Sequence, residues 1–416
     1  MSNKIFPVPN QKWFKEGELL LEFPSEWDVV PCLMNGHYAT ELTPSQIQAA
    51  FARPIDSPGL SELARGKKKV AIIFDDISRP TPVRSLLPHV FKELHEAGVP
   101  DTSIRFVCAT GCHGAHTYQD FERKLGSDIL DRFPVYNHNI YDNCTYVGDT
   151  SQGTKLYINS EVMCCDLKIG LGSVITHVQT GFGGGGKIIL PGVSSMDSIE
   201  HFHSLEAKAK EDGKGNTVGM GNYIDNPMTK DFCEAARLAA LDFKIDVIVN
   251  GAGKACAIFC GEVGSVYREA VNYAVPHYAT KPVPVTDIAV INTYSKGNEA
   301  IVGMIIGVAL LMEKGGDLVL IMDCPTGQVV HYLLGSFGTE IKGRRFQSVN
   351  FTLPWLKRLI ILCPQFEHAM ADWLAVPGTI WVKTWKDVMD TLRKDYPDGA
   401  KVAVVPDGTI QYLSFK

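Results

Sequence analysis

The residues of this chain that could do chemistry gather around four consecutive glycines, Gly183 to Gly186, with Lys187 directly after them. A glycine run gives up backbone entropy, and it suits close approach of the backbone to a bound group. Its N–H groups could also hold an anion. His177 lies ten residues before the lysine and His203 sixteen residues after it, and these histidines could form a metal or proton-transfer site. We therefore expect the functional site here.

The same segment matches most of a phosphate-binding P-loop. Gly181 to Lys187 fit the pattern G-x-x-x-x-G-K, but Ile188 stands where Ser or Thr would reach magnesium. Residues 188–192 also look extended and then turn, whereas a P-loop lysine opens a helix. The sequence therefore disfavours an NTPase and leaves phosphate binding by the glycines open. The glycines concerned are Gly183, Gly184, Gly185 and Gly186.

A second motif, Asp75-Asp76-Ile-Ser-Arg79-Pro80, directly follows an apolar run. Read functionally, Asp76 would bind a ribose hydroxyl or a similar donor. Arg79 would bind a carboxylate or phosphate, because its planar guanidinium holds such anions through two hydrogen bonds. Read as structure alone, the segment is a turn with a surface ion pair.

Histidines supply the remaining candidates. His113 follows Thr110-Gly111 and could act as acid or base near neutrality, although a lone histidine is more often packed or solvated. Cys112 could be a nucleophile, but most such cysteines are inert small hydrophobes. In the predicted helix from Met196, His201 and His203 are two residues apart, so only one of them should face a site. Their spacing does not say which one.

The elements that position these residues alternate between strand-like and helical patterns, which predicts an α/β fold. We expect two Rossmann-like α/β domains with the active site in the cleft between them. The motifs follow three predicted strands, and ligands of open α/β sheets bind beyond the carboxyl ends of the strands. The predicted helix is 83–97, and the predicted strands are 69–74, 104–110, 166–172, 243–250, 287–292 and 316–322.

Proline-rich residues 276–284 separate the two predicted domains. We expect a catalytic and cofactor-binding domain at 1–275, a second α/β domain at 276–400, and a tail at 401–416 that returns to the first domain. The chain has 416 residues, is 45% hydrophobic and carries a net charge of -6, which argues against nucleic-acid and anionic-membrane partners.

Three further features predict a cytoplasmic protein. Met1 to Pro9 lack the apolar core of a secretion signal. The eleven cysteines form no CxxC pair, which fits reduced thiols. The longest apolar run, Ala300 to Met312, is shorter than the roughly 20 residues that span a bilayer, and we expect a buried helix there.

Together these motifs resemble the nickel-dependent lactate racemase family over most of the N-terminal two-thirds of the chain. The segments that carry the resemblance are 75–80, 110–113, 147–159, the stretch from His177 through Lys187 to Gly192, the spacing to His203, and 221–227. The family binds a nickel pincer cofactor, a pyridinium mononucleotide with two sulfur arms and a carbon bonded to the metal. The resemblance therefore implies an isomerase that depends on nickel.

The resemblance also implies individual roles. Lys187 would hold the cofactor, with a covalent thioamide as one way of doing so, and His203 would be the protein ligand to nickel. The glycine run would approach the cofactor's phosphate, and Asp76 its ribose. His113 and His177 would be the two acid/base groups, one for each orientation of the substrate hydroxyl. Hydride would pass from C2 to the cofactor and return to the opposite face of the 2-keto acid.

The chain departs from the family where the second domain contacts substrate. Gly303 and Ile306 align with a glutamine and a lysine of lactate racemases, while polar residues stand earlier in the segment. We therefore expect Tyr294 and Asn298 to bind a different 2-hydroxy acid, such as a sugar acid. Lys296 and Glu299 are the other polar residues of this segment.

The predicted function is racemisation or epimerisation at C2 of a small 2-hydroxy acid. Two alternatives use the same glycines: a non-catalytic nucleotide- or anion-binding protein, and a carrier of the cofactor. The sequence does not predict the oligomeric state.

Overall fold

The computed structural model describes residues 3–333, 353–366 and 376–415, and it divides into two compact units. Unit 2 is Tyr38–Pro276, and unit 1 joins Met1–His37 to His277–Lys416. Each unit is built on a six-stranded, mostly parallel sheet. The predicted α/β class is therefore confirmed.

Unit 2 has the sheet order β13-β12-β9-β4-β5-β6, and only β13 runs antiparallel to its neighbour. The strand of this sheet that comes first in the chain, β4, lies in its middle. The next strands, β5 and β6, are added on one side of β4, and β9, β12 and β13 on the other, so the strand order changes direction between β4 and β9. The strands of this sheet are β4 (Val70–Asp75), β5 (Ile104–Ala109), β6 (Val135–Asn137), β9 (Leu167–Ser173), β12 (Phe243–Val249) and β13 (Ala255–Gly261). Two hairpins lie outside it: β7 (Cys144–Asp149) with β8 (Lys155–Asn159), and β10 (Thr176–His177) with β11 (Gly181–Phe182).

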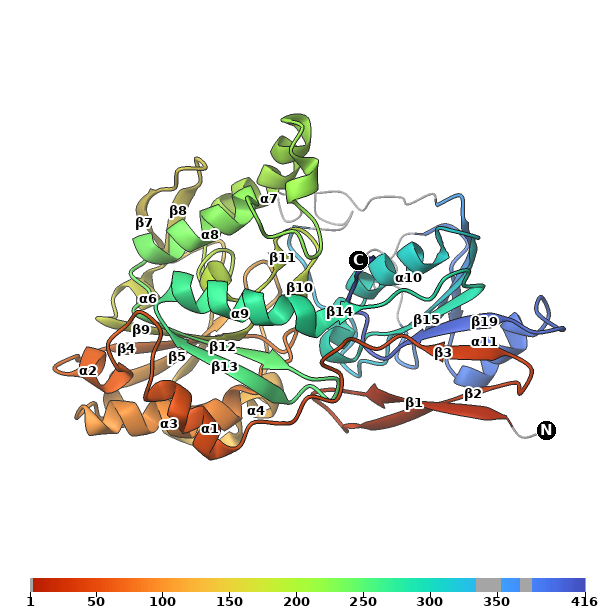
Figure 1. The fold of residues 1–416 in the computed structure, drawn as a ribbon. Coiled ribbons are helices and arrows are strands. Elements are labelled where there is room, and N and C mark those ends of the chain that lie inside the picture. The colour runs from red at the N-terminus through yellow and green to blue at the C-terminus, as the bar shows by residue number, and fades with distance from the viewer. Residues whose placement is uncertain (1–2, 334–352, 367–375, 416) are drawn as a thin grey trace. The chain divides into compact units, whose positions relative to one another are not determined.

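Helices cover both faces of this sheet, with α1, α3 and α4 on one side and α8 and α9 on the other (Figure 1). Burial on both faces explains why β4 is a continuous apolar run up to Asp75, and every residue of β4 is buried. The helices are α1 (Pro44–Phe51), α2 (Leu60–Ala64), α3 (Val83–Glu96), α4 (Tyr118–Leu125), α5 (Ser127–Arg132), α6 (Ser160–Met163), α7 (Met196–Glu211), α8 (Pro227–Leu238) and α9 (Val263–Tyr278). Short 3₁₀ turns are η1 (Asp101–Ser103), η2 (Gly185–Ile188) and η3 (Gly215–Thr217).

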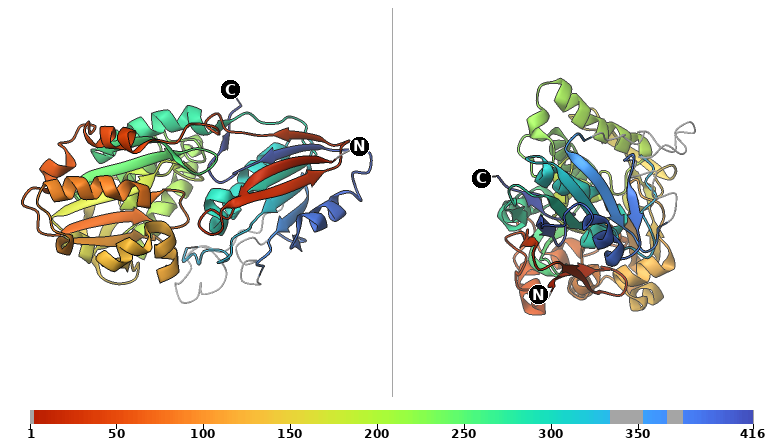
Figure 2. Two further views of the ribbon diagram at one scale, coloured as in Figure 1. Left: turned by 90° about the horizontal axis from the view of Figure 1, so that it is seen from below. Right: turned by 90° about the vertical axis from the view of Figure 1, so that its right-hand side faces the viewer.

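Unit 1 has the sheet order β18-β17-β16-β15-β19-β3, in which all neighbouring strands are parallel. The hairpin of β1 and β2 lies across this sheet (Figure 2). The strands are β1 (Lys4–Asn10), β2 (Gly17–Phe23), β3 (Asp28–Pro31), β14 (Ala279–Thr280), β15 (Ile288–Asn292), β16 (Gly316–Ile321), β17 (Leu356–Leu362), β18 (Ile380–Val382), β19 (Lys401–Val405) and β20 (Tyr412–Leu413). The helical elements are η4 (Tyr294–Glu299), α10 (Ile301–Leu311) and α11 (Trp385–Leu392).

The units differ from the domains expected from sequence at both ends of the chain. Residues 1–37 belong with the second α/β unit, because β3 pairs with β19 and the first hairpin packs on the same core. The tail from 401 also belongs there, since β19 pairs with β15, and β20 pairs with β14. Hydrogen bonds between strands distant in sequence, which local patterns do not encode, decide both assignments.

The strand and helix predictions are confirmed to within about two residues at each end. The apolar run at 300–312 does form helix α10, but it is not buried all round, because Ile305 and Met312 are exposed. Among the residues that the structure describes, no helix combines the length and apolar character needed to cross a membrane.

Candidate active site

Three loops of unit 2 that carry the candidate residues leave the sheet at one edge. They follow β9, β4 and β5, which are adjacent parallel strands, and the sheet order changes direction between the first two. Thr81 Oγ1 donates to Ser173 Oγ at 2.9 Å and so joins the loop after β4 to the end of β9. Open α/β sheets bind ligands at such a change of direction.

Asp76 is the centre of a buried hydrogen-bond network at this edge. Its Oδ2 accepts from His113 Nδ1 at 2.6 Å and from His116 Nε2 at 3.2 Å, and its Oδ1 accepts from the Ser78 N–H at 2.9 Å. Burial acts to raise the pKa of Asp76, but the two histidines outweigh burial and hold the pKa well below its usual value. The carboxylate that the sequence assigned to a ribose is thus already bonded to protein groups.

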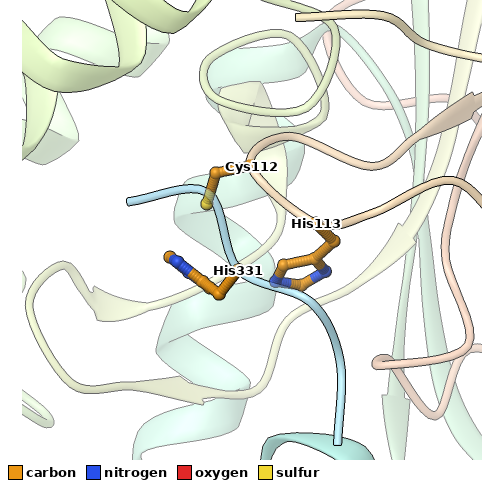
Figure 3. Close-up of side chains that lie close together, drawn as sticks. All are labelled: Cys112, His113 and His331. Atoms are coloured by element: carbon orange, nitrogen blue, oxygen red, sulfur yellow. The ribbon is translucent and has the colours of Figure 1, made fainter. Parts of the chain in front are cut away.

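This network fixes the ring of His113, which is buried. Because an ionised carboxylate only accepts hydrogen bonds, the Nδ1 of His113 carries a proton. The neutral ring then has its lone pair on Nε2, the form that can act as a base. Figure 3 shows His113 beside Cys112 on the loop after β5. The Gly111 N–H of this loop donates to the Gly192 carbonyl at 2.9 Å, which ties the loop to the segment that follows Lys187.

His177 has the opposite arrangement. It ends β10 and is half-buried, and its Nδ1 accepts from the backbone N–H groups of Gln179 at 3.2 Å and Thr180 at 3.3 Å. A neutral ring that accepts at Nδ1 carries its proton on Nε2. The two candidate histidines therefore present complementary ring nitrogens, a lone pair from His113 and an N–H from His177.

His203 has the geometry expected of a metal ligand. Its Nδ1 donates to the Ile199 carbonyl at 2.7 Å, which leaves the Nε2 lone pair for a metal. Burial lowers the pKa of His203 to about 4, and the charge of nearby Lys187 adds to that effect. The ring is therefore neutral at pH 7, as metal binding requires. His201, two residues earlier, bonds instead to Thr154 Oγ1 at 2.8 Å.

The glycine run has a packing role that the sequence did not reveal. A Cβ on Gly185 would lie 2.6 Å from the Tyr267 ring, and one on Gly186 would lie 2.2 Å from the Phe232 carbonyl oxygen. The Gly185 N–H donates to Asp246 at 2.7 Å. At Gly183 a Cβ would have room, with its nearest neighbour 3.7 Å away.

The segment around Lys187 also corrects one expectation. Residues 185–188 form the 3₁₀ turn η2, and turns continue to residue 193, so the stretch after Lys187 is not extended. The Lys187 N–H donates to the Gly184 carbonyl within this turn, and its side chain is half-buried.

The sequence missed Lys124, which supports the whole edge. Its side chain is 1% exposed and forms a 2.8 Å ion pair with Asp75. It also donates to the carbonyls of Asp76 and Arg79, both at 2.9 Å. Lys124 thus fixes the loop that carries both residues. The guanidinium of Arg79 is half-buried and donates to the Ser78 carbonyl at 2.8 Å.

In unit 1 the expected substrate residues lie in η4, directly after β15. Tyr294 and Asn298 are both buried, and burial raises the pKa of Tyr294. Lys296 and Glu299 form a buried ion pair of 2.9 Å in the same turn. At Gly303 a Cβ would lie 2.9 Å from the Thr293 side chain. Any side chain larger than that of glycine would therefore require its neighbours to shift.

Comparison with known proteins shows which proteins this chain is similar to. Residues 14–215 match the lactate racemase N-terminal domain. A lactate racemase of Lactiplantibacillus plantarum is 28% identical over 388 residues, which cover 87% of this chain and 89% of the relative. The chain is a relative of the lactate racemases. The predicted relationship to this family is therefore confirmed, and the relatives' name is that of an isomerase, the predicted enzyme class.

Two further comparisons bear on the family and its fold. The lactate racemase of Thermoanaerobacterium thermosaccharolyticum is 28% identical over 304 residues, 70% of this chain and 68% of the relative. A structure of the lactate racemase apoprotein from that organism matches with a TM-score of 0.72 at 22% identity, covering 99% of this chain and all of the other. A protein from Thermotoga maritima matches with a TM-score of 0.64 at 16% identity, covering 90% of this chain and all of the other. These structural matches establish the fold that this relative of the lactate racemases shares.

Proposed function

We propose that this protein is a racemase or epimerase that acts at C2 of a 2-hydroxy acid, either lactate-like or a sugar acid. The observation that carries the proposal is the complementary state of two histidines on one edge of the sheet, His113 and His177. A racemase must handle a hydroxyl in two orientations, so it needs two groups that can exchange a proton with it. A nucleotide- or anion-binding protein has no use for such a pair.

In the proposed mechanism, Nε2 of His113 takes the proton of the substrate hydroxyl. Asp76 stabilises the imidazolium that forms, because its carboxylate already bonds Nδ1. The Nε2–H of His177 donates a hydrogen bond to the substrate oxygen, as its neutral tautomer allows. When the hydride returns to the opposite face of the 2-keto acid, the His113 imidazolium gives its Nε2 proton back to the substrate oxygen, while His177 keeps its hydrogen bond to that oxygen. Arg79 would bind the substrate carboxylate.

The proposal includes a nickel-pincer nucleotide cofactor, and the residues present fit such a group. His203 offers a neutral Nε2, and Lys187 lies close enough to lower the pKa of that ring. Gly183 is the member of the glycine run with room beside its backbone. We assign His203 to the metal, Lys187 to the cofactor, and Gly183 to close approach. When bound, the cofactor would accept and return the hydride of C2.

Two finer points complete the proposal. Both units would be of the Rossmann type, which the strand order of unit 2, with its first strand central, supports. Tyr294 and Asn298 would select the substrate in place of the residues that lactate racemases use.

The alternative of a simple anion site is less well supported, because the Gly183, Gly185 and Lys187 N–H groups all bond within the protein.

The test measures nickel content and racemisation in protein produced in a host that makes the cofactor. We expect near-stoichiometric nickel in the wild type and its loss in His203→Ala. We expect His113→Ala and His177→Ala to keep nickel and to lose at least about 10²-fold in turnover of the active 2-hydroxy acid. Nickel-free wild-type protein, with a lactate racemase control loading normally, would favour the anion-binding alternative.

A further inference from the structure

We propose that His116 is a positively charged positioning residue that, through Asp76, sets the proton affinity of His113. The sequence left His116 without a role, three residues after His113 on the loop between β5 and α4. The electrostatic part of the proposal concerns the folded chain alone. Its consequence for catalysis rests on the function proposed above.

His116 lies between two carboxylates. Its Nε2 is 3.2 Å from Asp76 Oδ2, its Nδ1 is 3.8 Å from Asp120 Oδ2, and its side chain is 6% exposed. Ionised carboxylates offer only acceptors, so both ring nitrogens are best paired when both carry protons. Burial acts to lower the pKa of His116, but Asp120 and Asp76 raise it to about 9. The ring is therefore an imidazolium at neutral pH.

The surroundings hold this ring in place. Asn137 bonds the His116 backbone at both ends, accepting from its N–H and donating to its carbonyl, both at 2.9 Å. Asp120 is fixed as well, because it accepts from the Thr117 N–H and hydroxyl in the capping box of α4, both at 2.9 Å. Arg123 pairs with the other oxygen of Asp120 at 3.1 Å.

Among the hydrogen bonds of the described residues, His116 is a cation that bonds the Asp76 carboxylate, and the nearby lysine and arginine side chains bond elsewhere. Lys124 bonds the Asp76 carbonyl oxygen and pairs with the Asp75 carboxylate. Arg123 is directed to Asp120, and the Phe121 ring packs against His116 with centroids 6.4 Å apart. His113 and His116 are thus the two imidazoles that share Asp76 Oδ2.

Sharing one carboxylate oxygen has a direct consequence for His113. A carboxylate paired with one histidine alone favours its charged form and can shift its pKa by one to three units. A second, already charged ring on the same oxygen offsets part of that attraction and repels a second positive charge. We therefore expect His113 to lose its proton at a lower pH than the histidine of an isolated histidine–aspartate pair would.

The experiment is an NMR titration of the histidine rings in full-length, isotope-labelled protein. In His116→Gln the amide can still donate to Asp76 but carries no charge, and we expect the His113 titration midpoint to rise by about one pH unit. Asp120→Asn removes one of the two carboxylates that stabilise the positive charge of His116. We expect this variant to raise the titration midpoint of His113 as well, but by less than one pH unit. His95→Gln is the matched control, because His95 also pairs with an aspartate, Asp101 at 2.8 Å, but on an exposed surface.

A His113 midpoint that is unchanged or lower in both His116→Gln and Asp120→Asn, each folded by circular dichroism, overturns the proposal. A separate experiment measures racemisation activity. If the chain racemises a 2-hydroxy acid, the acid limb of its pH–rate profile should move up by the same amount in His116→Gln. A shifted NMR midpoint in a chain without racemase activity would support the role of His116 and count against the proposed function instead.

Discussion

At the residue scale, the chemistry of the site depends on which ring nitrogen of each histidine is hydrogen-bonded and whether it donates or accepts. His113 and His203 both donate through Nδ1, to a carboxylate and to a backbone carbonyl, and both thereby keep the Nε2 lone pair. His177 accepts at Nδ1 and presents a proton instead. Three histidines that look alike in the sequence thus take two different tautomers, which their hydrogen-bond partners set.

Asp76→Asn should disable His113 without unfolding the protein. The amide can turn its N–H toward Nδ1, which moves the ring proton to Nε2 and removes the base. We expect a loss of about 10² to 10⁴-fold in racemisation, with nickel content unchanged. Racemisation assays on nickel-loaded protein test this, and wild-type rates in the variant would contradict the role given to Asp76.

His116 should make stability depend on pH in a defined window. Its pKa is raised from 6.5 to about 9, so its contribution is complete below pH 6.5 and is lost as the pH rises through about 9. The contribution is at most about 3.5 kcal/mol, at roughly 1.4 kcal/mol per pKa unit. Urea unfolding at pH 6, 7.5 and 9 should show this decline in the wild type.

The control for that experiment is His116→Gln, in which the decline between pH 6.5 and 9 should be much smaller. Equal slopes for the two proteins would mean that His116 is not charged in the folded state.

At the scale of elements, the turn η2 and the helix α8 pack so closely that only glycine fits between them. A methyl group on Gly186 would meet the Phe232 carbonyl oxygen, whereas one on Gly183 would not meet a close neighbour. Packing thus requires glycine at position 186 but not at position 183 of the same run.

Gly186→Ala should lower the free energy of unfolding by about 3 kcal/mol or more, because the backbone must shift to admit the methyl group. Gly183→Ala should leave stability nearly unchanged but reduce nickel loading if the backbone there approaches the cofactor. Chemical denaturation and elemental analysis of both variants would measure the two effects. Equal stabilities of the two variants would contradict this packing account.

At the scale of the whole molecule, the two ends of the chain build one unit. Leu21, Phe23 and Trp27 are buried in the same core as β15, β16 and β17. The Phe23 ring lies 5.3 Å from the Trp385 ring in α11. The first hairpin therefore stabilises a unit that is otherwise made of C-terminal residues.

Phe23→Ala should destabilise unit 1 by about 3 to 5 kcal/mol, because Phe23 is fully buried. Hydrogen exchange measured by mass spectrometry should show faster exchange in β15 to β17 and little change in β4, β5 and β9. Leu20→Ala is the matched control, since Leu20 lies in the same strand and is 52% exposed. Faster exchange confined to unit 2 would contradict the assignment of the hairpin.

Sequence by itself determined the elements and the family. The apolar run 70–74 forms a strand that is buried on both faces of a parallel sheet, as such runs are. The spacing from His177 through Lys187 to His203 carried the resemblance. It also predicted that three polar motifs follow three strands, since the carboxyl ends of parallel strands meet at one edge.

Only the tertiary structure decided which side chains are hydrogen-bonded to one another. Asp76 is 37 residues from His113 in the chain, and Lys124 is 48 residues from the carbonyl it bonds. No local pattern encodes contacts at such separations, so sequence patterns point Asp76 to a ribose and predict no role for His116 or Lys124. The pairing of β3 with β19 is a contact of the same kind, and it moved the first 37 residues into the other unit.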